Sequence, residues 1–260
     1  GGDGSNNTPV GNPVNNCGNC NVPVYTAPVL EEEDVEYTIP PCQKLNNLFN
    51  EPDPNLKAII TTLKTNIDVN STGEIGAVLK KGRPTQYLPA TEEAQINFVT
   101  NNFAYTFIHT HPLNAYPMFT WGDVLTLYEL KNTTSKYNHL KGLESFILIC
   151  KDDNGDFQTY AIVMEPGFFN SLDLIFKNKN IPRFKNMEPA DIAKALDSEL
   201  EKKYKNESNN TSADYEKAFL QHLSSLASNV SLYKANVSLD NWSRVAVNTS
   251  TQNTMEIPCE

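Results

Sequence analysis

The chain has 260 residues, of which 39% are hydrophobic and 20% charged, so it can bury a sizeable core and is not of disordered composition. A net charge of −10 disfavours binding to phosphate backbones, and no nucleic-acid partner is expected. The longest aliphatic run, Phe146–Cys150, is far shorter than the roughly 20 apolar residues of a membrane helix, so no membrane span is expected.

Residues 1–40 are predicted to form a flexible tether. Asn fills seven of the first 21 positions, and a segment this rich in Asn, Gly and Pro buries too little apolar surface to fold. Its composition resembles the stretch that follows the lipidated cysteine of bacterial surface lipoproteins. The resemblance implies a secreted or cell-envelope-anchored protein, tethered to lipid upstream of residue 1, whose signal segment is not in this sequence.

Helices and strands are expected to alternate in the next part of the chain. Apolar residues recur at helical spacing over 41–66, and Pro52 and Pro54 divide this pattern into two helices. In chain order the patterns then predict a strand over 73–79, a strand over 86–88, a helix over 91–99, a strand over 103–109 and a helix over 120–130.

The remaining segments complete an α/β fold. Strands over 144–151 and 156–164 are joined by a hairpin turn, helices follow over 167–178, 188–205 and 213–228, and strands over 230–237 and 242–247 form a closing hairpin. This order predicts a mixed central β-sheet flanked by helices. We expect a core domain over 41–165 and a C-terminal extension of helices and a hairpin over 166–260, packed on the core.

The five cysteines leave two interpretations open. Cys150 ends an apolar strand and is expected to be buried and inert, while one or two disulfides would form among the other four if the protein is exported. Alternatively, Cys17, Cys20, Cys42 and Cys259 could form a four-cysteine zinc site, although the chain has no second C-x-x-C.

Two of the four histidines lie side by side at the end of a predicted strand. His109 and His111 are two residues apart, so their imidazoles project from the same face of the strand. Imidazole pairs at this spacing can bind Zn²⁺. His139 and His222 are placed on helix or loop surfaces and are assigned no role.

Asp123 follows His111 by twelve residues, in Thr120-Trp-Gly-Asp123 at the start of a predicted helix. It could supply a third ligand and leave a fourth position for water, as a catalytic zinc requires. The same four residues also match a capping box, with Thr120 as the N-cap and Asp123 as its partner. An H-x-H pair likewise occurs as two hydrogen-bonded histidines without a metal.

The segment Phe107–Asp123 resembles the zinc motif of JAMM metalloproteases, also called the MPN domain. That resemblance covers about residues 70–165 and implies a cytidine-deaminase-like layering of helices and a sheet. It implies that His109, His111 and Asp123 bind Zn²⁺. It also places Thr120 at the family's serine position and Glu74 at its general base. The chain departs from the motif in having Thr instead of Ser and one extra residue before Asp123.

The resemblance implies hydrolysis of a peptide or isopeptide bond in a peptide or protein substrate. Glu74 would accept a proton from the attacking water, and the Thr120 hydroxyl would help to stabilise the oxyanion. In another interpretation Glu74 is an exposed carboxylate, and Glu92 or Glu93 reaches the site. The loop 112–119 and Trp121 are expected to form an aromatic wall beside the metal, unless Trp121 only packs the start of the helix. A zinc-less scaffold or binding protein at the cell surface is the alternative function.

Overall fold

The computed structural model describes residues 39–69, 73–89, 96–165, 171–177, 181–205 and 211–260. The predicted tether lies outside these residues, except for its last two positions. The described residues belong to one compact unit that extends to Glu260.

One eight-stranded mixed sheet runs through the described residues. Its strands are β1 (Gly76–Lys80), β2 (Arg83–Leu88), β3 (Ala104–Thr110), β4 (Ser145–Lys151), β5 (Phe157–Met164), β6 (Val230–Ala235), β7 (Trp242–Val247) and β8 (Thr254–Pro258). Their spatial order is β2-β1-β3-β4-β5-β6-β7-β8, and only β3 and β4 are parallel. The C-terminal hairpin therefore extends the same sheet as the predicted core, and β8 is a strand that the sequence analysis missed.

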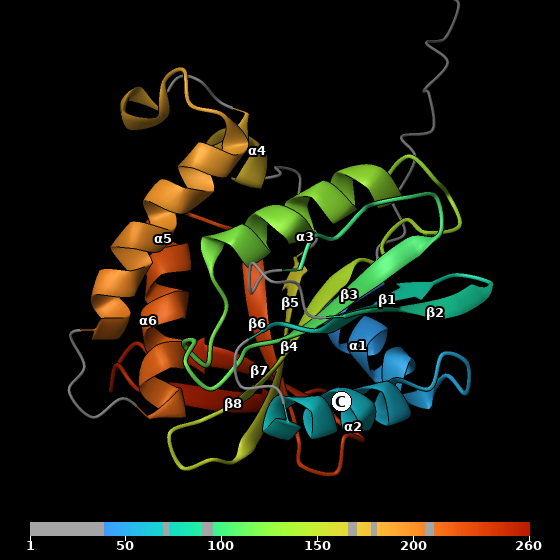
Figure 1. The fold of residues 1–260 in the computed structure, drawn as a ribbon. Helices are drawn as coiled ribbons and strands as arrows, with labels where there is room; N and C mark the ends of the chain where they lie inside the picture. Colours follow the sequence, from blue (N-terminus) through green and yellow to red (C-terminus); the bar gives the residue numbers. More distant parts are fainter. Residues whose placement is uncertain (1–38, 70–72, 90–95, 166–170, 178–180, 206–210) are drawn as a thin grey trace, which may run out of the picture. The chain divides into compact units, whose positions relative to one another are not determined.

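Six α-helices in the described residues cover the two faces of this sheet. They are α1 (Pro41–Asn50), α2 (Leu56–Val69), α3 (Trp121–Thr134), α4 (Ser171–Phe176), α5 (Pro189–Lys205) and α6 (Ser212–Ser225). Figure 1 shows α3 to α6 on one side of the sheet and α1 and α2 on the other. The predicted α/β class with a mixed sheet between helices is confirmed.

Strand β4 is apolar without a break because both of its faces are buried. Phe146 and Leu148 point into the cluster beneath α3 to α6, whereas Ile147 and Ile149 point into the cluster beneath α1 and α2. A strand covered by helices on both faces has no polar side, so the period of two disappears. Strand β3, which carries His109, is buried along its whole length for the same reason.

The segment that follows residue 95 differs from the prediction. A helix was expected over 91–99, but 96–99 contains no helix, and 90–95 lie outside the described residues. Ile96 and Phe98 instead cover Gly76, where an added Cβ would lie 2.5 Å from the Ile108 carbonyl oxygen and 2.9 Å from Ile96. Phe98 also stacks on Phe107, with ring centroids 4.5 Å apart. Tertiary contact with β1 and β3 outweighs the helical pattern here.

A disulfide joins Cys42, in the first turn of α1, to Cys259, which follows β8. Their two sulfurs are therefore not available for the alternative four-cysteine zinc site. Cys150 is buried and free, as predicted, and Cys17 and Cys20 lie outside the described residues. A disulfide fits an extracytoplasmic domain. Among the described helices, none is long and apolar enough to cross a membrane.

Candidate metal centre

His109 and His111 bring their Nε2 atoms to within 3.1 Å of each other at the carboxyl end of β3. Both side chains are buried. The Nδ1 of His109 lies 3.2 Å from the Ile147 carbonyl oxygen, and the Nδ1 of His111 lies 2.7 Å from that of Tyr116. A carbonyl only accepts, so these contacts place a proton on each Nδ1 and leave a lone pair on each Nε2 in the neutral rings. In this tautomer each Nε2 can ligate a metal.

Asp123 completes a group of three ligands. Its Oδ1 lies 3.2 Å from Nε2 of His109, and its Oδ2 lies 4.0 Å from Nε2 of His111. One ligand atom from each of the three residues lies within 4.8 Å of the other two. Tetrahedral bonds of about 2.0–2.1 Å would space ligand atoms roughly 3.3 Å apart. The buried lone pairs and the carboxylate therefore fit a metal ion, and the triad could hold one.

The capping box at the start of α3 orients Asp123. Its Oδ2 accepts hydrogen bonds from the backbone N–H of Thr120 at 2.7 Å and from the Thr120 hydroxyl at 3.0 Å. The hydroxyl in turn accepts from the Asp123 N–H at 3.2 Å. The capping box is confirmed, and it does not compete with ligation, because Oδ1 remains directed at His109. Thr120 is partly exposed, and its hydroxyl is engaged in the cap.

Glu74 lies two residues before β1, so its expected place within a strand is wrong. The paired register of β1 with β3 begins at Gly76, and before it the Ile75 carbonyl accepts from the Thr110 N–H at 2.9 Å. The Glu74 side chain nevertheless points to the triad, with Oε1 3.9 Å from Nε2 of His111. Its Oε2 accepts from the backbone N–H of Ile96 at 3.3 Å. The alternative residues Glu92 and Glu93 lie outside the described residues.

The four ionisable groups shift one another's pKa values. Burial alone would raise the pKa of Asp123, but the charge and hydrogen bond of His109 lower it to about 2. Burial opposes protonation of His109, yet Asp123 and Glu74 raise its pKa on balance. Burial, and then the charge of His109, lowers the pKa of His111 to about 4. Burial raises the pKa of Glu74, which suits a group that exchanges protons.

Of the aromatic residues expected beside the metal, Phe119 lies next to the histidines, whereas Trp121 follows the alternative interpretation. The Phe119 ring lies 6.1 Å from that of His109, which also stacks on Phe146 at 4.6 Å. Trp121 is fully buried and donates from Nε1 to Nδ1 of His222 at 2.9 Å. Trp121 therefore packs the start of α3. His222, expected on a surface, is buried as its partner.

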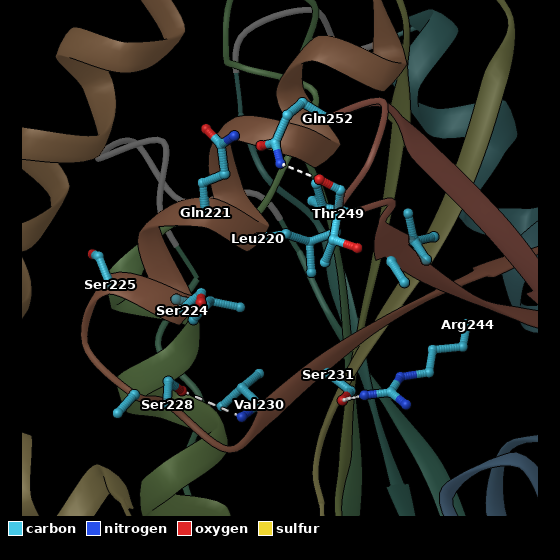
Figure 2. Close-up of a pocket in the computed structure, with 15 residues that line it drawn as sticks. Leu220, Gln221, Ser224, Ser225, Ser228, Val230, Ser231, Arg244, Thr249 and Gln252 are labelled. Atoms are coloured by element: carbon cyan, nitrogen blue, oxygen red, sulfur yellow. Dashed lines mark hydrogen bonds between the residues drawn. The ribbon is translucent and has the colours of Figure 1, made fainter.

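A separate pocket lies between α6 and the strands β6 and β7 (Figure 2). Its volume is about 680 Å³, and its lining combines aliphatic side chains with hydroxyls and amides. Its described lining residues include no His, Cys, Asp or Glu. The Arg244 guanidinium is already hydrogen-bonded to Ser231 at 3.3 Å and lies 3.9 Å from Glu165. This pocket therefore offers no second metal centre.

Comparison with protein-family models, with curated proteins and with solved structures finds no match to this chain.

Proposed function

We propose that the protein is a zinc-dependent hydrolase that cleaves a peptide or isopeptide bond. The observation that carries the proposal is the convergence of two buried Nε2 lone pairs, the Oδ1 of Asp123 and the carboxylate of Glu74 at one end of β3. Two imidazole nitrogens and two carboxylates gathered in one buried place form a donor set that suits a divalent cation.

His109, His111 and Asp123 would hold the ion. When bound, Zn²⁺ supplies Lewis acidity and lowers the pKa of a coordinated water towards about 7. The histidine Nδ1–H groups donate to the Ile147 and Tyr116 carbonyls and so keep the rings oriented. The buried surroundings exclude competing water from the histidine side of the site.

Glu74 is the proposed general base. Its Oε1 lies 3.9 Å from Nε2 of His111, whereas Asp123 comes to 3.2 Å from Nε2 of His109. The longer approach of Glu74 suits a group that handles protons and does not bind the metal. It would take a proton from the attacking water and deliver it to the leaving amine. The Thr120 hydroxyl would turn from its bond to Asp123 towards the oxyanion.

The substrate class rests on the likeness of Phe107–Asp123 to the JAMM motif. Peptide-bond hydrolysis needs an activated water, an oxyanion stabiliser and a proton donor for the amine. Glu74 would serve the first and third of these tasks, and Thr120 the second. A peptide or protein at the cell surface is the proposed substrate.

Emission spectroscopy of purified protein tests the metal first. The wild type is expected to carry about one zinc per chain, and His109→Ala is expected to carry none. His139→Ala is a matched control, since this exposed histidine lies outside the group of three and its Nε2 is 3.1 Å from the Asn102 carbonyl oxygen. A wild type that binds no zinc, even when Zn²⁺ is added, would refute the enzyme and favour a zinc-less scaffold. A peptide-library digest then identifies the cleaved bond.

A further inference from the structure

The first turn of α3 has four backbone N–H groups that no helical carbonyl can satisfy. The capping box provides acceptors for two of them, on Thr120 and Asp123. The other two, on Trp121 and Gly122, are bound by a single carboxylate from another helix. Asp197 of α5 accepts from Trp121 N–H through Oδ1 and from Gly122 N–H through Oδ2, the latter at 3.2 Å.

The Asp197 carboxylate therefore binds the two residues that immediately precede the proposed ligand Asp123. A negative charge at the amino end of a helix is favourable, because the unpaired N–H groups carry partial positive charge. With both oxygens bound to adjacent N–H groups, Asp197 fixes the direction of the first turn as well as its distance from α5. Any rotation of that turn moves Asp123, the third residue of the helix, relative to His109.

Two further contacts join the same turn to the C-terminal helices. The Tyr204 hydroxyl of α5 donates to the Phe119 carbonyl at 3.0 Å. The Trp121 indole donates to His222 of α6. The residues on both sides of Thr120 are therefore fixed by α5 and α6, whereas β3 fixes the two histidines. The two halves of the triad are positioned by separate parts of the fold.

We infer that Asp197 is a positioning residue for the metal site, and that it holds the first turn of α3 so that Oδ1 of Asp123 faces Nε2 of His109. The inference rests on the proposed zinc function. Asp197 does not contact the triad itself and is not a catalytic residue. Helices α5 and α6 are in this view part of the support of the proposed metal site.

The test compares metal affinity with stability in Asp197→Asn. The amide oxygen can accept from one N–H, but the amide NH₂ opposes the other, so the turn must shift. Loss of a group that orients a metal ligand typically lowers metal affinity about 10–100-fold. We expect this loss in Zn²⁺ competition with a chromophoric chelator. Asp191→Asn is the matched control, because it makes the same chemical change at an exposed residue in the first turn of the same helix. It should change affinity less than about twofold.

A cobalt spectrum separates positioning from general stability. Co²⁺ bound to wild type and to Asp197→Asn should differ in the visible bands, which report ligand geometry. Asp197→Glu keeps the carboxylate and should recover part of the Zn²⁺ affinity. It shows whether the loss in Asp197→Asn comes from the missing carboxylate and not from poor folding. Wild-type affinity and an unchanged Co²⁺ spectrum in folded Asp197→Asn, or in folded Asp197→Ser if the Asn variant does not fold, would overturn the inference alone. A wild type that binds neither Zn²⁺ nor Co²⁺ would instead overturn the proposed function.

Discussion

The indole Nε1 of Trp121 and the imidazole Nδ1 of His222 form a buried hydrogen bond of 2.9 Å between residues 101 positions apart. Since Nδ1 accepts, the proton of a neutral His222 sits on Nε2, which lies 3.5 Å from Glu199. Glu199 in turn binds Arg183 at 2.9 Å. The start of α3 is thus linked through α6 and α5 to the surface.

His222→Leu should destabilise the protein. The substitution leaves a buried indole N–H without an acceptor, which costs about 1–3 kcal/mol. Urea unfolding of chelator-treated protein measures the free energy of unfolding. Ser224→Ala, at an exposed residue two positions away on the same helix, is the control. Equal stability of wild type and His222→Leu would show that the indole finds another acceptor.

Glu74→Gln should separate catalysis from metal binding. The amide keeps the shape of the side chain but cannot serve as a base, and general-base catalysis is typically worth about 10²–10⁴ in rate. Hydrolysis of the peptide found in the library digest should fall by about that factor, while zinc content and melting temperature stay unchanged. Asp156→Asn, at the exposed hairpin tip, should keep full activity. Full activity in Glu74→Gln would remove Glu74 from the mechanism.

Tyr116→Ala should leave zinc in place, because His111 is held by the backbone carbonyl of Tyr116 and not by its side chain. The ring packs on Tyr204 and Tyr215, with centroids 5.1 and 6.1 Å away, and is partly exposed beside the site. Removing an aromatic contact should raise KM about fivefold or more. Zinc analysis and steady-state kinetics check both parts. Loss of zinc would make the side chain structural.

The triad could be predicted from the sequence because its spacing is local. His109 and His111 share one strand face, and Thr120-x-x-Asp123 marks a helix start whether or not a metal binds. Asp197 and His222 could not be found this way, since their partners lie 76 and 101 positions earlier and no periodicity marks them. A histidine on a helix shows no sign in the sequence that it will face an indole.

The fold, like the site, could be predicted where the sequence signals are local. Apolar runs and hairpin turns predicted seven of the eight described strands, because those signals are local. The exposed edge strand β8, Thr254–Pro258, has little apolar alternation, and only pairing with β7 defines it. The helical pattern at 96–99 failed because contacts of Ile96 and Phe98 with β1 and β3 decide that segment's path.

The metal-free protein should lose stability as pH rises from about 4 to about 7 through Asp197. Burial, with the charges of Asp123 and Glu201, raises its pKa to about 7 from 3.8, although the Trp121 and Gly122 N–H groups oppose this. A folded-state pKa above the unfolded value stabilises fully below the unfolded value, and this stabilisation is lost as pH rises through the folded value. Asp197→Asn should remove a difference on the order of 1–3 kcal/mol between pH 5 and 7.5. Urea unfolding with chelator at both pH values measures it, and an identical pH dependence in the two proteins would contradict the assignment.

Removing the disulfide should lower stability by about 2–5 kcal/mol, because Cys42–Cys259 closes a loop spanning 217 residues. The double variant Cys42→Ser/Cys259→Ser should therefore unfold at lower urea concentration than the wild type. Dithiothreitol should bring the wild type down to the same midpoint and leave the double variant unmoved. A wild type indifferent to the reductant would show that the cross-link adds nothing.

The disulfide also determines how the folded unit responds to mechanical force. The Cα atoms of Cys42 and Cys259 are 5.3 Å apart, so the two ends of the described unit meet at one covalent bond. A pull applied between the chain segments on either side of the unit passes through that bond and bypasses the residues between. The hydrogen bonds of the sheet, and the turn that carries Asp123, would bear almost none of the tension. When the unit is pulled from its two ends, His109, His111 and Asp123 would keep their arrangement under load for as long as the two sulfurs stay joined.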